Sequence, residues 1–204
     1  MPRFEDQLEK IEAIDRATWR NWLQQNHETA IGIWLIYYKV KSDKPSVRYP
    51  EAVKEALCFG WIDSKAKSLD DDRYMQIFTP RKPKSVWSKL NKQYIEELIE
   101  QGLMTDVGIR KIEAAKLDGS WTSLDAIEAL IMPPDLIEAL GKNAVSFAGA
   151  KGNAQRNFEA FNNSTKKVIL YWIESAKRSE TRQNRIEKTV IAAVENRSPL
   201  DRST

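Results

Sequence analysis

The segment AIGIWLIYYKV at 30–40 places large apolar side chains at consecutive positions, without the polar alternation of a strand that borders water. Successive side chains of a strand point to opposite faces of its sheet. The segment therefore predicts a strand that is buried on both faces. The side chains concerned are Ile31, Ile33, Leu35 and Tyr37 on one face and Trp34, Ile36, Tyr38 and Val40 on the other.

Helices are predicted on either side of this strand. Asp15 is a good N-terminal cap, and apolar residues recur after it at helical spacing as far as Asn26, whereas the stretch from Phe4 fits either a helix or a short strand. After the strand, Pro50 suits the first turn of a second helix, and Gly60 is a natural stop for it.

A hairpin and two more helices complete the N-terminal part. Residues 61–79 follow a strand pattern that is interrupted at 70–72 by three aspartates, which are typical of a turn. Ser85 is the expected cap of the next helix, and Thr105 caps the one after it. The expected apolar face of the helix after Ser85 consists of Val86, Leu90, Tyr94, Ile95 and Leu98.

Beyond Trp121 the patterns indicate only helices and loops. A short helix is predicted from Pro134 through Leu140, and the small residues at 141–152 fit a loop or a weak helix. Two amphipathic helices follow, and we expect the chain itself rather than a second copy to cover them. Their apolar faces consist of Val168, Ile169, Trp172, Ile173 and Ala176, and of Ile186, Val190, Ala193 and Val194.

These patterns predict an α+β fold that is predominantly helical. We expect an α+β portion with a small antiparallel sheet at 1–122 and a C-terminal helical module at 123–204, forming one compact unit.

Composition narrows the function. The 204 residues hold 32 basic and 29 acidic side chains, a balance that does not favour nucleic acid or a membrane surface as partner. The lone Cys58 and lone His27 supply neither a disulfide nor a four-ligand Cys/His zinc site. No apolar run is long enough to span a bilayer, and no signal peptide is recognisable. We therefore expect a cytoplasmic protein without a metal or cofactor and without integral membrane association.

The strongest local asymmetry is a basic segment. No acidic residue lies between Arg73 and Ile95, and three aromatic residues are interleaved with the basic ones. One interpretation is an anion site, where the helix opening near Ser85 offers free amide groups and a positive dipole end. The alternative, slightly favoured, is a solvated basic loop with core aromatics. The basic residues are Arg73, Arg81, Lys82, Lys84, Lys89 and Lys92, and the aromatics are Tyr74, Phe78 and Trp87.

A candidate ligand site is predicted between the hairpin and the helix after Ser85. Asp63 is the best single candidate for a functional carboxylate, but it has no partner carboxylate at a fixed spacing, so a structural role is favoured. Asn91 could line a pocket between Trp87 and Tyr94, although such an amide more often binds the backbone. The residues expected to face one concavity are Trp61, Asp63, Arg81, Lys82, Trp87 and Asn91.

Two other groups are interpreted structurally. Cys58 lies in an apolar helix where its thiol behaves as a buried hydrophobe, and His27 can cover the carbonyls of a helix end. Arg178, Arg182 and Arg185 share a helical face that could bind an acidic partner, but neighbouring glutamates favour a salt-bridged surface.

Several strings resemble the bacterial YdeI/OmpD-associated, or bacteriocin-protection, family. They include ALCFGWID in 51–74, FTPR in 78–92 and AKRSETR in 161–188, and similarity extends through MPPDLIEAL at 132–140. The segment at 141–157 looks like an insertion relative to that family. The resemblance implies protection against bacteriocins or antimicrobial peptides and a link to porins, but it assigns no reaction, substrate or catalytic residue.

Three functions remain open from the sequence. The leading hypothesis is a non-catalytic binding or stress-protection protein with a small anionic ligand or a protein partner. The second is an enzyme of unrecognised type that acts on a small anionic substrate. The third and weakest is a nucleic-acid binder that uses the basic segment at 73–92.

Overall fold

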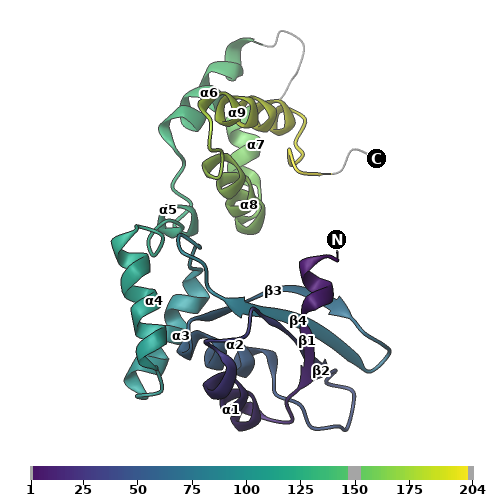
Figure 1. The fold of residues 1–204 in the computed structure, drawn as a ribbon. Coiled ribbons are helices and arrows are strands. Elements are labelled where there is room, and N and C mark those ends of the chain that lie inside the picture. Colours follow the sequence, from purple (N-terminus) through teal and green to yellow (C-terminus); the bar gives the residue numbers. More distant parts are fainter. Residues whose placement is uncertain (1, 147–152, 202–204) are drawn as a thin grey trace. The chain divides into compact units, whose positions relative to one another are not determined.

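The structure, a computed structural model, describes residues 2–146 and 153–201. The chain divides into two compact units, residues 1–123 and 124–204, here called the N-terminal and C-terminal units (Figure 1). Each unit has its own hydrophobic core.

The N-terminal unit contains a four-stranded sheet in the order β1-β2-β4-β3. Strands β2, β4 and β3 pair antiparallel, whereas β1 pairs parallel with β2. The sheet is therefore mixed, not purely antiparallel as expected, because helix α1 connects β1 to β2 as a crossover. The elements are the 3₁₀ helix η1 (Phe4–Gln7), β1 (Glu9–Glu12), α1 (Arg16–Asn26), β2 (Ile33–Tyr38), α2 (Tyr49–Cys58), β3 (Trp61–Ser68), β4 (Arg73–Pro80), α3 (Lys89–Glu100) and α4 (Asp106–Leu117).

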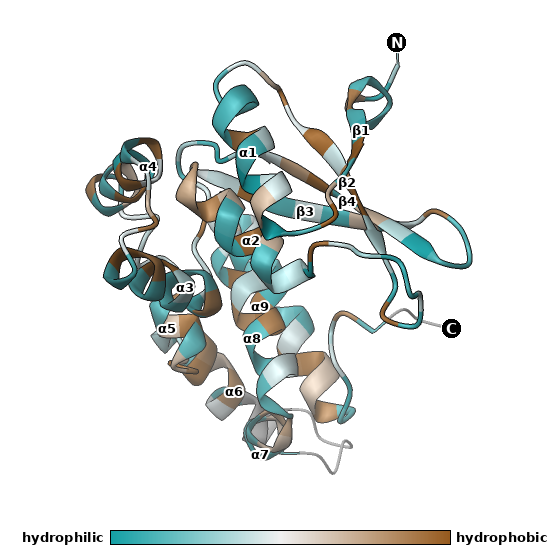
Figure 2. Cartoon of the chain, turned by 90° about the horizontal axis from the view of Figure 1, so that it is seen from below, coloured by the Kyte–Doolittle hydropathy of each residue, from teal (hydrophilic) through white to brown (hydrophobic). Residues whose placement is uncertain are grey.

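Strand β2 is buried on both faces, as predicted for its central residues. Leu35 belongs to the core that includes residues of α1 and α2, which lie against one face of the sheet (Figure 1). Trp34 and Ile36 belong to a smaller cluster on the opposite face. Figure 2 shows this concentration of hydrophobic residues along β2 and the hydrophilic character of much of β3. Ile31 and Val40 were expected on these faces, but they lie outside the strand and are 58% and 85% exposed.

The helix caps follow the sequence with one exception. Asp15 and Thr105 cap α1 and α4, and Gly60 follows α2 with φ of +69°. Helix α3, however, begins at Lys89 and is capped by Ser88, not by Ser85. The Ser85 hydroxyl instead donates to the Lys82 carbonyl at 2.7 Å and closes a turn. Val86 lies before helix α3 and Leu90 on it, and both, expected on the apolar face, are exposed, by 38% and 50%.

In the described residues of the C-terminal unit, helices are the regular secondary structure, and they are joined by turns and loops. Helix α6 continues past Leu140 to Ser146, which agrees with the helical alternative for residues 141–146, and residues 147–152 lie outside the described residues. Residues of α6 to α9 share one core, so the chain itself covers the last two helices, as expected. The helices are α5 (Asp125–Glu128), α6 (Pro134–Ser146), α7 (Ala154–Ala160), α8 (Asn163–Glu174) and α9 (Ser179–Val194).

The apolar stripe of α8 is narrower than the sequence predicted. Ile169 and Ile173 are buried, but Val168 is 55% exposed and Trp172 is only partly buried. The Arg185 guanidinium covers the Trp172 ring at 5.3 Å from its centroid. Trp172 is thus a boundary residue of this core, not its centre.

Candidate functional site

Three of the six predicted site residues line one pocket. Arg81, Lys82 and Trp87 surround it, in the loop between β4 and α3. Trp61, Asp63 and Asn91 are not among its lining residues.

Arg81 is the most unusual residue of this loop, because it is only 3% exposed and has no carboxylate within ion-pairing distance in the described part of the chain. Its guanidinium lies 3.6 Å from the centroid of the Trp87 ring, and its Nη1 donates to the Val86 carbonyl at 2.8 Å. Its Nε and Nη2 are buried without a hydrogen-bond partner among the described residues. Burial lowers the pKa of Arg81 to about 10, against a smaller opposing effect of the Asp63 charge.

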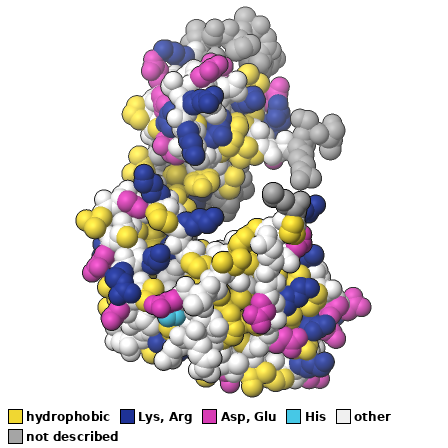
Figure 3. All heavy atoms as spheres, viewed as in Figure 1, with side chains coloured by type: hydrophobic (Ala, Val, Ile, Leu, Met, Phe, Trp, Pro, Cys, Tyr) yellow, Lys and Arg dark blue, Asp and Glu magenta, His cyan; other side chains and the backbone are white. Residues whose placement is uncertain are grey.

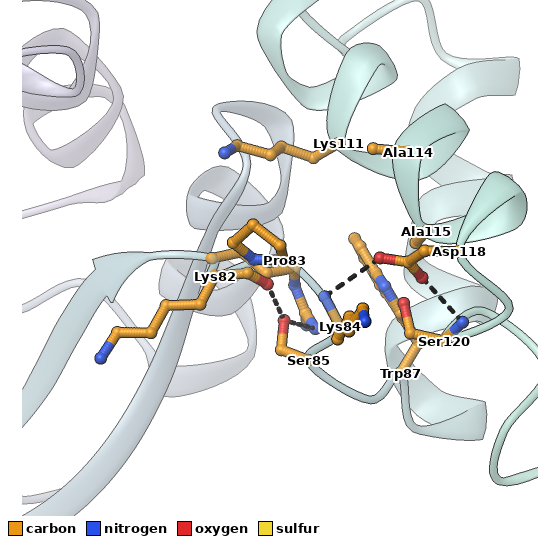
Figure 4. A pocket seen from close by; sticks show the side chains of 11 residues that line it. Lys82, Pro83, Lys84, Ser85, Trp87, Lys111, Ala114, Ala115, Asp118 and Ser120 are labelled. Atoms are coloured by element: carbon orange, nitrogen blue, oxygen red, sulfur yellow. Dashed lines mark hydrogen bonds between the residues drawn. The ribbon is translucent and has the colours of Figure 1, made fainter.

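The pocket beside this guanidinium, here called the Arg81 pocket, has a volume of about 60 Å³. One wall is the loop after β4, and the other is the C-terminal end of α4 with the residues just beyond it (Figure 4). The Lys82 and Lys111 side chains extend away from Asp118 and Ser120, so their amines point away from the pocket (Figure 4). The full lining consists of Arg81, Lys82, Pro83, Lys84, Ser85, Trp87, Lys111, Ala114, Ala115, Asp118 and Ser120.

Asp118 joins the two walls. It accepts hydrogen bonds from the Lys84 amide at 3.1 Å and from the Ser120 amide at 2.9 Å. Lys84 adopts φ of +60° to make this contact, a conformation uncommon for a residue with a side chain. Ser120 and Lys84 hold the pKa of Asp118 below its usual range. The carboxylate therefore fixes the loop to the end of α4 and is a weak base.

The other predicted site residues have structural contacts. Asp63 accepts from the Tyr49 hydroxyl at 2.9 Å and from the Gln76 amide at 2.7 Å. Burial, with a smaller contribution from Asp63, raises the pKa of Tyr49 to about 12. Trp61 is 1% exposed within the core. Asn91 donates its backbone amide to the Ser88 hydroxyl at 3.1 Å, as part of the cap of α3.

Cys58 and His27 do not form a nucleophile and base. Burial raises the pKa of the Cys58 thiol to about 11, which keeps it protonated at neutral pH. The His27 Nδ1 lies 2.9 Å from the Leu23 carbonyl oxygen at the end of α1. The buried Cys58 thiol and the His27 contact at the end of α1 agree with the structural interpretation of these residues.

Sequence reasoning missed two features of this unit. Glu55 is 1% exposed and forms ion pairs with Arg16 and, at 2.6 Å, with Arg20. Its position among apolar residues of α2 was the available signal. The far wall of the Arg81 pocket, with Asp118 and Ser120, was also missed, because it comes from a helix that no motif connects to the basic segment.

No group of three or more His, Cys, Asp or Glu side chains in the described residues is arranged to hold a metal ion. Across the same residues, no helix combines the length and apolarity required to cross a membrane.

Two family models match the chain. Residues 129–196 match the family described as bacteriocin-protection, YdeI or OmpD-associated. The C-terminal unit carries a region of this family. Residues 11–111 match a domain of unknown function, which includes Arg81 and the loop after β4. Comparison with curated proteins and with solved structures gave no match. The resemblance to the YdeI/OmpD-associated family is therefore supported for the C-terminal unit, whereas the Arg81 pocket lies in the other unit.

Proposed function

We propose that the protein is a non-catalytic binding protein whose N-terminal unit holds a small oxyanion, a phosphate or carboxylate group, in the Arg81 pocket. The observation that carries this proposal is the pair of buried Arg81 nitrogens, Nε and Nη2, that have no acceptor among the described residues. A buried donor without a partner costs about 1–3 kcal/mol. An oxyanion would supply the missing acceptors, because the planar guanidinium fork matches two oxygens of one such group.

The size and surroundings of the pocket support a small ligand group. Its volume of about 60 Å³ exceeds the roughly 30 Å³ that a water molecule takes up in the liquid, and it suits a group of a few non-hydrogen atoms. Lys82, Lys84 and Lys111 are among the lining residues, so the surroundings of the pocket are positively charged. The indole of Trp87 holds the guanidinium from one side, so the fork is positioned before a ligand arrives.

Binding is favoured over catalysis by the state of the nearby groups. Asp118 is the carboxylate among the lining residues, and its lowered pKa makes it a poor proton acceptor. Cys58 lies elsewhere and remains a thiol.

A small ligand is also favoured over nucleic acid. Arg73 is engaged by Glu12 and Asp70, and Arg81 is buried, so the basic segment is not one exposed stripe. Phe78 and Trp87 are core residues and cannot stack on bases. On the face shown in Figure 3, basic and acidic side chains are interspersed.

A second part of the proposal concerns the biological role. The family description attached to residues 129–196 supports a part in bacteriocin protection. We further propose that the protein is bacterial, acts more broadly in stress resistance and is located in the cytoplasm. This role would involve the C-terminal unit, while the anion would bind to the N-terminal unit.

Calorimetric titration with inorganic phosphate at constant ionic strength tests the anion site. Wild-type protein should bind phosphate, and phosphate at a hundred times its Kd should stabilise the fold by about 2.7 kcal/mol. Arg81→Met should abolish both effects. Arg73→Met is the matched control, because it removes an exposed arginine that already has carboxylate partners.

A third variant keeps the test decisive if Arg81→Met does not fold. Asp118→Asn removes the negative charge of the pocket and keeps one of the two oxygens that accept from the Lys84 and Ser120 amides, so a folded variant should bind phosphate more tightly. Phosphate binding that is absent in the wild type, or equal in the wild type and a folded Arg81→Met variant, would contradict the proposal.

A further inference from the structure

We infer that a second cavity of the N-terminal unit binds an organic anion with an apolar body. This cavity, here called the sheet cavity, has a volume of about 720 Å³ and lies on the face of the sheet that carries Ile77, opposite α1 and α2. Its walls come from the beginning of η1, from Ile31, from β3, from the end of β4 and from the loop at 81–83. The volume is within the range of small-molecule sites.

Apolar side chains form one part of this cavity. Phe4 and Ile31 line it and remain 47% and 58% exposed, although both are large hydrophobic residues. Ile77 lines it from the buried cluster of the sheet. Exposed apolar side chains that converge on a concave surface are typical of a binding site, whereas scattered ones need no explanation. A ligand body of aliphatic or aromatic carbon would remove this surface from water.

Positive charge dominates the other part. Arg3, Lys65, Arg81 and Lys82 line the cavity, and Glu5 is its acidic residue. Lys65 binds Glu5 at 2.8 Å, so this pair neutralises itself. Arg3 and Lys82 form no ion pair with any residue that the structure describes. These two cations remain available to the anionic group of a ligand.

The wall formed by η1 is held in place without a ligand. The Glu5 carbonyl accepts a hydrogen bond from the Trp34 indole at 3.0 Å, and the Glu5 carboxylate accepts from Lys65. Leu8, directly after η1, packs with Trp34 in the buried cluster of this face. The cavity is therefore preformed, which lowers the entropic cost of binding.

This inference rests chiefly on Arg3, Ile31 and Ile77, which do not line the Arg81 pocket, whereas Lys82 and the rest of the loop at 81–83 border both cavities. The ligand class is a carboxylate, sulfonate or phosphate that carries a hydrocarbon chain or ring. Its charged end should lie by Arg3 and Lys82 and its body against Ile31 and Ile77.

Titration of the full chain with straight-chain carboxylates from acetate to octanoate tests the inference. Affinity should rise roughly two- to fourfold with each added carbon that the cavity covers. Octan-1-ol, which has the same body without the charge, should bind at least about tenfold more weakly than octanoate. Equal binding of octanoate and octan-1-ol, or no dependence on chain length, would overturn the inference.

Two variants locate the site. Ile31→Asp places a negative charge in the cavity wall and should weaken octanoate binding about tenfold or more. Val40→Asp is the matched control, because Val40 is an exposed apolar residue of the same unit that does not line the cavity. Octanoate binding that is unchanged by Ile31→Asp, or lowered equally by both variants, would place any binding elsewhere and contradict the inference.

Titration with inorganic phosphate distinguishes binding in the sheet cavity from binding in the Arg81 pocket. Phosphate lacks an apolar body, and Ile31 does not line the Arg81 pocket, so Ile31→Asp should leave phosphate binding unchanged. Absence of phosphate binding to the wild-type protein would refute the Arg81 proposal alone. Carboxylate affinity that does not depend on chain length would refute the proposed ligand of the sheet cavity alone.

Discussion

The two units treat buried polar groups differently. In the N-terminal unit, buried side-chain atoms without hydrogen-bond partners occur on Arg16, His27, Tyr37, Arg81 and Ser120. The described residues of the C-terminal unit contain none. Such atoms are costly, so they are expected to gather where a ligand completes the hydrogen bonding. The comparison supports the proposed binding site in the N-terminal unit, because Arg81 and Ser120 both line the Arg81 pocket.

Two arginines illustrate the difference. Arg182 of the C-terminal unit binds Asp135 at 2.6 Å and Glu174 at 3.0 Å, and these partners raise its pKa. Arg81 of the N-terminal unit is more deeply buried, has no such partner among the described residues, and has a lowered pKa. The contacts of Arg182 stabilise the fold, whereas those of Arg81 leave part of its fork available.

The largest expected effect concerns the core of the C-terminal unit. Phe158 is 1% exposed at the centre of that core, so Phe158→Ala should lower the free energy of unfolding by about 3–5 kcal/mol. Trp172→Ala should cost clearly less, because Trp172 is a partly exposed boundary residue. Urea unfolding followed by circular dichroism measures both. A larger loss for Trp172→Ala than for Phe158→Ala would contradict the description of this core.

Two substitutions of polar side chains, one in each unit, should change the free energy of unfolding by smaller amounts and in opposite directions. Tyr37 is 1% exposed and its hydroxyl has no hydrogen-bond partner in the described structure, so Tyr37→Phe should raise the free energy of unfolding by about 1 kcal/mol. The Asn157 amide donates to the Ala193 carbonyl at 2.8 Å, so Asn157→Ala should lower it by about 1 kcal/mol.

The exposed Tyr171 provides the control for the tyrosine change, since Tyr171→Phe should leave stability unchanged. Chemical denaturation of all three variants under one buffer condition makes the comparison. A destabilised Tyr37→Phe variant would show that its hydroxyl is satisfied and would remove one of the differences between the units.

Much of the fold could be predicted from local patterns. The run of apolar residues around Leu35 requires a buried strand, and Asp15 and Thr105 are caps whose side chains bind the amides expected of them. The parallel pairing of β1 could not be predicted, because residues 9–12 carry too few apolar side chains to distinguish strand from helix. Ser88 replaced Ser85 as a cap because Ser85 closes a turn of its own.

The candidate site was predictable only in part. The absence of acidic residues around Arg81 made an anion site the second interpretation after a solvated basic loop, and the structure brings Lys82 and Trp87 to the same pocket as Arg81. The opposite wall depends on a contact between Lys84 and Asp118, which lie far apart in the sequence. Burial of a particular arginine is also a property of the tertiary fold, because the same residue type is usually exposed.

The most direct test of the central claim is an NMR titration that follows the Nε–H signals of arginine while inorganic phosphate is added. The Arg81 signal should shift in a saturable manner, because its Nε has no acceptor until an oxyanion arrives. The Arg182 signal should stay in place, because its Nε already donates to Asp135 at 2.6 Å. An Arg81 signal that does not move at phosphate concentrations that saturate binding, or that moves no more than the Arg182 signal, would contradict the account.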